Sequence, residues 1–151
     1  MKYENILNKL EGQWLCQRTN YFIHNKKVTY NKQEISLKQT QNIYIPEKEK
    51  YVIYNYQLYN KKNHERTYYL FFKQEQSHLG ELHKITNDQI KYYRFTIHTN
   101  NCIKIESVKK NVLYNEYIYL INSKFKIIIC VLKENQKYLA ASFISEIKVS
   151  N

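Results

Sequence analysis

The sequence has very little glycine and proline, the residues on which tight turns, flexible linkers and phosphate-binding loops depend. Its 151 residues include two glycines and one proline. Collagen-like segments and the glycine-rich loops of P-loop and dinucleotide-binding enzymes are therefore excluded. At this length one core buries about two thirds of the surface of the unfolded chain, so we expect residues 1–151 to form a single domain.

Cysteine is also scarce. Cys16, Cys102 and Cys130 are odd in number and have no CxxC spacing, which argues against both a disulfide scaffold and a zinc site. The five histidines are scattered, without the spacing of metal ligands. We therefore expect a reducing compartment, no bound metal and no permanently bound cofactor.

Long hydrophobic runs are absent. The longest, at 127–132, is far shorter than the roughly 18 apolar residues of a membrane-spanning helix. The first residues carry neither the hydrophobic core of a signal peptide nor the Arg- and Ser-rich composition of a transit peptide. We expect a soluble protein that works without a membrane, in the compartment where it is made.

Arginine is rare, although the chain is strongly basic. The 24 Lys and Arg residues exceed the 13 Asp and Glu residues by 11, yet only three of the 24 are arginines. Abundant Lys, Asn, Ile and Tyr is typical of A/T-rich coding, as in an organelle genome, so the charge alone does not indicate nucleic-acid binding. A barrel that binds RNA through its 16 tyrosines and its lysines remains a minor hypothesis.

Most of the chain alternates between apolar and polar residues. Ile6, Leu7 and Leu10 have the spacing of a short amphipathic helix that ends at Gly12. The segments that follow are rich in Tyr, Ile, Val, Phe and Thr and predict strands at 13–23, 27–38, 41–46, 50–60, 66–75, 78–85, 89–98, 102–109, 113–121, 125–133 and 137–149. Their short connections suit hairpins. We therefore expect an all-β protein with one short N-terminal helix and an antiparallel up-and-down barrel of about ten strands, similar to lipocalins and fatty-acid-binding proteins.

The alternation also predicts which side chains point into the barrel. Trp14, Cys16 and Arg18 share one face of their strand. Residues 12–14, G-Q-W, resemble the G-x-W signature by which lipocalin-type barrels place a Trp across their closed end, and a simple role as a large core aromatic is the alternative. An inward Arg18 needs a carboxylate, a ligand acid or water near the mouth, while a rim position that faces solvent stays open. Glu116 and Lys126 lie on consecutive strands and are expected either to pair inside the barrel or to form an exposed cross-strand salt bridge.

Residues 12–19, G-Q-W-L-C-Q-R-T, resemble a family segment. The S-type phycobiliprotein lyases, the CpcS/CpeS family, begin with a short helix followed by G-x-W-x-S-Q-R-T, and Cys16 stands where that segment has Ser. Residues 116–120 match the family's E-R-I-W-F segment, and residues 142–148 are similar to its S-F-x-S-E-I-R close. The resemblance thus reaches from one end of the chain to the other.

Three further regions depart from the family pattern. Arg94 begins a match to an R-Y segment, with Phe in place of Tyr. Lys126 and Ile128 fall on the two basic positions of an R-x-R pair, so one cation is changed and the other is lost. Tyrosines at 51–59 stand where the family has tryptophans. A lysine cannot make the bidentate carboxylate contact of arginine, so these changes bear on ligand affinity.

The resemblance implies an enzyme, a lyase that binds an open-chain tetrapyrrole (a bilin, such as phycoerythrobilin or phycocyanobilin). The lyase attaches the bilin through a thioether to one cysteine of a phycobiliprotein subunit, which we expect to be a β subunit. On this hypothesis Glu116 is the catalytic residue, because it meets the pyrrole nitrogens, and Arg18 and Lys126 hold the propionates. The other residues expected to bind the bilin are Arg94, Trp14, Tyr54 and Tyr56.

The resemblance also implies a place and partners. The bilin is a substrate, the acceptor is a phycobiliprotein of the phycobilisome, and the expected location is the plastid stroma, with a cyanobacterial cytoplasm as the alternative. Whether the lyase forms a homodimer or needs a partner lyase subunit stays open. The alternative function is a non-catalytic lipocalin-like carrier of a small ligand or fatty acid, which shares the barrel and the inward arginine but needs no carboxylate opposite the ligand.

Overall fold

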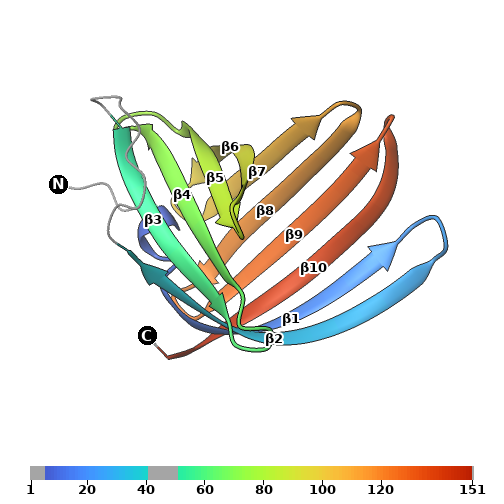
Figure 1. The fold of residues 1–151 in the computed structure, drawn as a ribbon, viewed down its shortest axis with the longest axis horizontal. Coiled ribbons are helices and arrows are strands. Elements are labelled where there is room, and N and C mark those ends of the chain that lie inside the picture. The colour runs from blue at the N-terminus through green and yellow to red at the C-terminus, as the bar shows by residue number, and fades with distance from the viewer. Residues whose placement is uncertain (1–5, 41–50, 151) are drawn as a thin grey trace.

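Ten antiparallel strands close into a barrel in the computed structural model of the chain, which describes residues 6–40 and 51–150 (Figure 1). Each strand pairs with its neighbours in sequence, and β1 and β10 pair to close the sheet. The strands are β1 (Gly12–Phe22), β2 (Lys27–Gln39), β3 (Tyr51–Asn60), β4 (Arg66–Gln74), β5 (Leu79–Thr86), β6 (Gln89–Thr99), β7 (Cys102–Lys109), β8 (Val112–Asn122), β9 (Phe125–Glu134) and β10 (Lys137–Ser150). The expected all-β, up-and-down barrel is confirmed.

Tight turns explain how a chain with so little glycine forms hairpins. Asn87 and Asp88, between β5 and β6, have φ angles of 49° and 65°, and Asn135 and Gln136, between β9 and β10, have φ angles of 49° and 66°. Two successive residues with positive φ are the signature of the turn that matches the twist of an antiparallel pair, and Asn and Asp tolerate that conformation. The strand expected at 41–46 lies outside the described residues.

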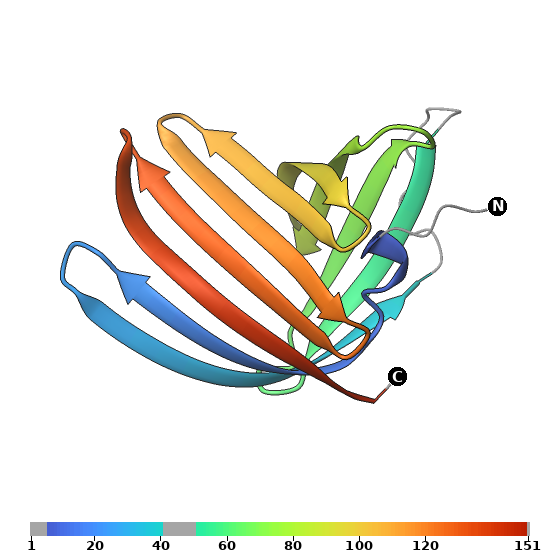
Figure 2. The same ribbon diagram turned by 180° about the vertical axis from the view of Figure 1, so that it is seen from behind.

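The N-terminal segment forms a 3₁₀ turn, η1 (Ile6–Asn8), instead of the expected amphipathic helix. The turn is long enough to bury Ile6 and Leu7 completely, and the strand geometry begins already at Gly12. Figure 2 shows η1 at the end of the barrel opposite the β1–β2 hairpin. No helix within the described residues is long and apolar enough to span a membrane.

The hydrophobic core fills the end of the barrel that η1 covers. Trp14 is fully buried there, and its indole Nε1 donates a hydrogen bond to the Leu10 carbonyl at 3.1 Å. The Tyr56 hydroxyl donates to the Leu7 carbonyl, which fixes η1 against β3. Phe71 belongs to the same cluster. The predicted packing of Trp14 across the closed end is confirmed, and the polar part of the interior lies on the other side of this core.

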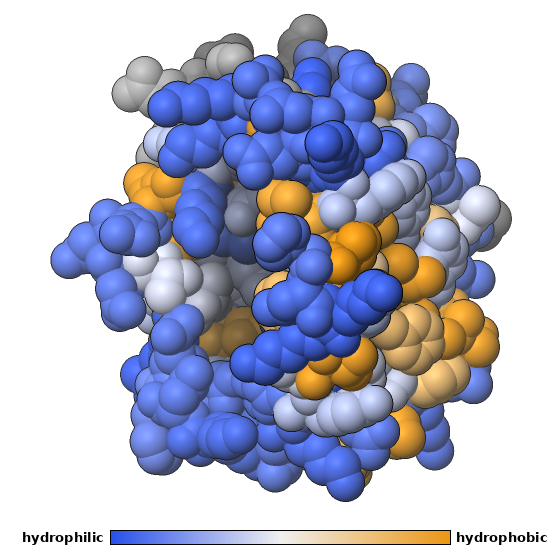
Figure 3. Space-filling view, turned by 90° about the vertical axis from the view of Figure 1, so that its right-hand side faces the viewer, coloured by the Kyte–Doolittle hydropathy of each residue, from blue (hydrophilic) through white to orange (hydrophobic). Residues whose placement is uncertain are grey.

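The outer face of the barrel is less polar than simple alternation predicts. Ile129 on β9 pairs with Phe143 on β10, and Leu15 on β1 pairs with Ile147 on β10. Each of these four side chains is at least 36% exposed. Figure 3 shows hydrophobic side chains gathered beside a hollow in the surface.

Candidate functional site

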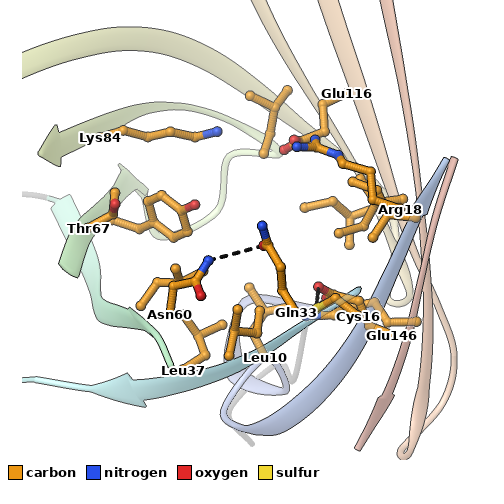
Figure 4. Close-up of a pocket in the computed structure, with 18 of the residues that line it drawn as sticks. Leu10, Cys16, Arg18, Gln33, Leu37, Asn60, Thr67, Lys84, Glu116 and Glu146 are labelled. Atoms are coloured by element: carbon orange, nitrogen blue, oxygen red, sulfur yellow. Dashed lines mark hydrogen bonds and ion pairs between the residues drawn. The ribbon is translucent and has the colours of Figure 1, made fainter. Parts of the chain in front are cut away.

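A cavity of about 340 Å³ occupies the interior beyond the core. Apolar side chains line its inner part, among them Leu37, Leu82 and Ile105, and polar and charged side chains line the rest. Figure 4 shows these side chains converging from opposite walls. The charged members of the lining are Arg18, Glu65, Lys84, Glu116, Lys126 and Glu146. Ligand pockets are typically apolar with a few convergent polar groups, and this cavity fits that description.

A buried ion pair lies deep in the cavity. The Lys126 ammonium is 2.9 Å from a Glu146 carboxylate oxygen, and both side chains are almost fully buried. The ammonium also lies 4.2 Å from the centre of the Trp14 ring, in position for a cation–π interaction. The Cys16 thiol donates to the other Glu146 oxygen at 2.8 Å. Both oxygens of Glu146 and the charge of Lys126 are thus already engaged within the protein.

This pair corrects the expectation that Glu116 and Lys126 pair with each other. In the β8–β9 register, Glu116 is opposite Cys130, and Lys126 is opposite Leu120. The hairpin between the two strands is so tight that Lys126, next to the turn, cannot lie opposite a residue as far from it as Glu116. Lys126 is instead directly opposite Glu146 on β10.

Glu116 accepts hydrogen bonds from two neighbouring side chains. The Tyr114 hydroxyl donates to a Glu116 carboxylate oxygen at 3.0 Å, and the Cys130 thiol lies 3.7 Å from the same oxygen. Burial and the charge of Glu116 raise the pKa of Tyr114. Burial and the charge of Glu116 also raise the pKa of Cys130. Both neighbours therefore remain protonated donors near neutral pH.

Lys84 extends into the cavity from β5, on the wall that faces Arg18 in Figure 4. Its ammonium lies 4.7 Å from the centre of the Tyr93 ring and 5.3 Å from the centre of the Tyr69 ring. Burial lowers the pKa of Lys84, but the charge of Glu116 and the two phenols raise it more, so the net shift is upward. Lys84 therefore carries its positive charge into the cavity at neutral pH.

The chain is 64% identical over 151 residues, the full length of both proteins, to a chromophore lyase CpcS/CpeS homolog of Gracilaria tenuistipitata var. liui. The chain belongs to the CpcS/CpeS chromophore lyase family. No family model matches the chain.

Solved structures show the same fold. The S-type phycobiliprotein lyase CpeS of Guillardia theta matches all of this chain and 94% of its own, with a TM-score of 0.69 and 15% identity. A protein of unknown function of the DUF3598 family from Nostoc punctiforme matches 95% of this chain and 49% of its own, with a TM-score of 0.51 and 10% identity. The barrel is therefore the fold of a CpcS/CpeS lyase.

Three of the residues expected to act in the lyase lie on the cavity wall. Arg18, Glu116 and Lys126 all line it, as the alternation along β1, β8 and β9 predicts. Arg18 is exposed and therefore lies near the mouth, where water satisfies its charge when no ligand is bound. Ile128, at the position where the family has its second basic residue, also lines the cavity but offers only carbon atoms.

The other four expected ligand residues do not line the cavity of this lyase. Trp14 and Tyr56 are fully buried in the core, and Tyr54 packs against that core. Arg94 is exposed on the outer face, because Phe95 next to it points inward. The geometry thus gives Arg94 no place on the cavity wall, its role in bilin binding stays a prediction, and the three aromatic residues pack at the closed end.

Lys84 is the functional candidate that the sequence analysis missed. Its signal was the alternation of Leu82 and Lys84 on one strand, which sends Lys84 inward if Leu82 is in the core. The abundance of lysine in the sequence hid this signal. No group of three or more His, Cys, Asp and Glu side chains that would hold a metal ion occurs in the part of the chain that the structure describes.

Proposed function

We propose that this lyase binds an open-chain tetrapyrrole in its cavity and transfers it to one cysteine of a phycobiliprotein subunit, forming a thioether. One observation carries the proposal: the cavity of a CpcS/CpeS family member presents the carboxylate of Glu116 and the guanidinium of Arg18 to the same space. A bilin has two propionates, an apolar conjugated body and pyrrole nitrogens that become cationic on protonation. It therefore needs the opposite charges that this cavity offers.

Glu116 is the group that meets the pyrrole nitrogens. Its carboxylate is held by the Tyr114 hydroxyl, so its position is fixed before the ligand arrives. A carboxylate near protonated pyrroles stabilises their positive charge and keeps the chromophore in its protonated form. Arg18, near the mouth, donates two parallel charge-assisted hydrogen bonds to a propionate.

Lys126 was the other cation expected to hold a propionate. Its ammonium is paired with Glu146 at 2.9 Å and is buried, so it has little charge to offer a ligand. We assign it the task of pairing with the buried Glu146 carboxylate beside the Trp14 ring.

The bond-forming step uses the thiol of the acceptor protein. The sulfur adds to the exocyclic carbon of the ethylidene group on ring A. One carbon–sulfur bond forms, the exocyclic double bond becomes a single bond, and the proton of the thiol ends on the tetrapyrrole. No oxidant is needed. The lyase's own Cys16 and Cys130 are poor nucleophiles, because burial raises the pKa of both thiols.

The size of the cavity fits a donor better than a permanent carrier. A volume of about 340 Å³ is near the lower end of the range for ligand pockets, and a bilin has about forty non-hydrogen atoms. Part of the chromophore therefore extends out of the mouth, where the acceptor cysteine can reach it. At roughly 0.3 kcal/mol per atom the affinity limit is about nanomolar, and a donor that must release its cargo is expected to bind more weakly.

Absorption spectroscopy tests the proposal. Purified protein is mixed with phycoerythrobilin or phycocyanobilin, and the visible spectrum is recorded with and without an excess of oleate. The lyase function predicts a red-shifted band that oleate does not displace. An unshifted bilin spectrum, together with tight oleate binding, would favour the fatty-acid carrier and overturn the proposal.

The location is also part of the proposal. We place the protein in the plastid stroma, because its Lys-, Asn-, Ile- and Tyr-rich composition suits an A/T-rich organelle genome. The position of the gene tests this: a plastid genome supports it, and a nuclear gene with a secretory leader contradicts it.

A further inference from the structure

Apart from Glu65, five charged side chains line the cavity, and two of them already pair with each other. Lys126 and Glu146 form the buried ion pair described above and cancel each other. Arg18, Lys84 and Glu116 remain. Glu65 also lines the cavity, but it is an exposed residue beside the turn between β3 and β4. Leaving Glu65 aside, the two cations Arg18 and Lys84 face one carboxylate, Glu116, so the cavity has an excess of one positive charge.

Neither of the two cations is held by a carboxylate within the described part of the chain. The ion pairs there join Lys61 to Glu34, His83 to Glu81, Lys104 to Glu106 and Lys126 to Glu146, and include neither Arg18 nor Lys84. Lys84 is positioned by the faces of the Tyr69 and Tyr93 rings instead. The faces of aromatic rings position an ammonium group, and its N–H groups can still donate hydrogen bonds to an anion. Its donors thus remain available to a ligand.

Arg18 and Lys84 face a common chamber from different strands. Arg18 comes from β1 and Lys84 from β5, with β2, β3 and β4 between them in the sheet. In Figure 4 the two side chains extend into the cavity from opposite sides. The charges of Glu116, Arg18 and Lys84 all act on the Cys130 thiol, so all three groups lie within electrostatic range of one point on the wall.

We propose that Lys84 binds a propionate of the bilin, opposite the propionate bound by Arg18. The inference rests on the proposed lyase function. Lys84 on β5 then supplies a second cation for a propionate. On β9, by contrast, Ile128 replaces one of the two basic residues of the family pattern. Lys84, and not Lys126, is then the residue that binds the second propionate. A ligand with two carboxylates and a cationic centre then matches the two cations and the carboxylate of Glu116, charge for charge.

A comparison of acid and ester ligands tests the role of Lys84. Dissociation constants are measured by absorbance titration for phycocyanobilin and its dimethyl ester, with wild type, Lys84→Gln and Lys84→Arg. Lys84→Gln is expected to weaken binding of the free acid by about tenfold or more, because a charge-assisted hydrogen bond is lost. Binding of the dimethyl ester should change less than twofold, and Lys84→Arg should retain most of the affinity for the acid.

Lys133→Gln is the matched control. Lys133 also lies over a tyrosine ring, 4.3 Å from the centre of Tyr138, but it does not line the cavity. The control removes the same charge and the same kind of contact, and both ligands should bind it as they bind wild type. Lys84→Met, which keeps a long unbranched side chain, replaces Lys84→Gln if the glutamine variant does not fold.

Two results would overturn the inference. An equal loss of affinity for acid and ester would show that Lys84 acts on the shape of the site or on Glu116, and no loss for either ligand would show that it does not touch the bilin. Failure of the proposed function itself looks different: wild type would then bind neither ligand.

Discussion

The Cys16 thiol and the Glu146 carboxylate lie 2.8 Å apart on the paired strands β1 and β10. Burial, and then the charge and hydrogen bond of Glu146, raise the pKa of this thiol above its ordinary value of 9.0. The folded protein therefore keeps a proton that the unfolded chain releases in alkali.

The first prediction concerns alkaline pH. A group whose pKa is higher in the folded state stabilises the fold at pH values below its unfolded value and loses this contribution as the pH rises. Resistance to urea should therefore fall between pH 8 and pH 10. In Cys16→Ala the fall should be smaller, since the alanine has no proton to lose. An equal fall in both proteins would contradict the role of Cys16.

The second prediction concerns the buried ion pair. Lys126→Met leaves the Glu146 carboxylate buried without its cation, and should lower the free energy of unfolding by about 3–5 kcal/mol. The double variant Lys126→Met/Glu146→Leu, which removes both charges, should recover most of this loss. Lys124→Met, at an exposed lysine of the same hairpin, is the control and should stay near wild type. Urea denaturation measures all three, and a double variant less stable than the single one would refute this account.

The third prediction concerns Gly80, where β5 and β6 pack closely. A Cβ atom at this position would lie 2.4 Å from the Phe95 ring and 2.6 Å from the Phe72 carbonyl oxygen. Because the backbone oxygen cannot move away freely, Gly80→Ala should cost about 1–3 kcal/mol in thermal or urea unfolding. Gln89→Ala, at an exposed position of the adjoining hairpin, should cost much less. Equal stabilities would show that the close contact does not matter.

The fourth prediction concerns the protonation of the bound chromophore. Glu116→Gln removes the negative charge and keeps the size of the side chain, so the variant should bind the bilin but lose the long-wavelength band of its protonated form. Glu106→Gln, which removes a carboxylate that pairs with Lys104 and does not line the cavity, should keep that band. A spectrum of Glu116→Gln identical to that of wild type would refute the assigned role.

The side chains that face the interior of β1, β8 and β9 could be predicted from the sequence, because alternation needs only one anchor per strand. With Trp14 placed inside, Arg18 follows, and with Ile118 inside, Glu116 follows. The fold class followed from the same alternation and from the short connections. These predictions do not depend on where a strand begins or ends, so an error of one or two residues in a predicted strand end does not change them.

The register between neighbouring strands could not be predicted in the same way, nor could the lysine that faces the cavity. Pairing Glu116 with Lys126 required the exact offset of β8 against β9, which is set by a tight turn with an irregularity between Leu120 and Asn122. Lys84 could not be told from the other lysines without knowing the position of Leu82 in the core. The outward position of Arg94 could not be predicted from the family match, because matching residue types says nothing about which face of a strand they occupy.

Transfer of the chromophore tests the central claim most directly. The lyase, a bilin and an apo-phycobiliprotein subunit are incubated together, and covalent adducts are located by mass spectrometry after denaturation. If the protein is a bilin lyase, a thioether should form at one acceptor cysteine, and much faster than in a reaction without the lyase. No adduct should form on Cys16 or Cys130 of the lyase. An adduct yield and site distribution that are the same with and without the protein would contradict the account.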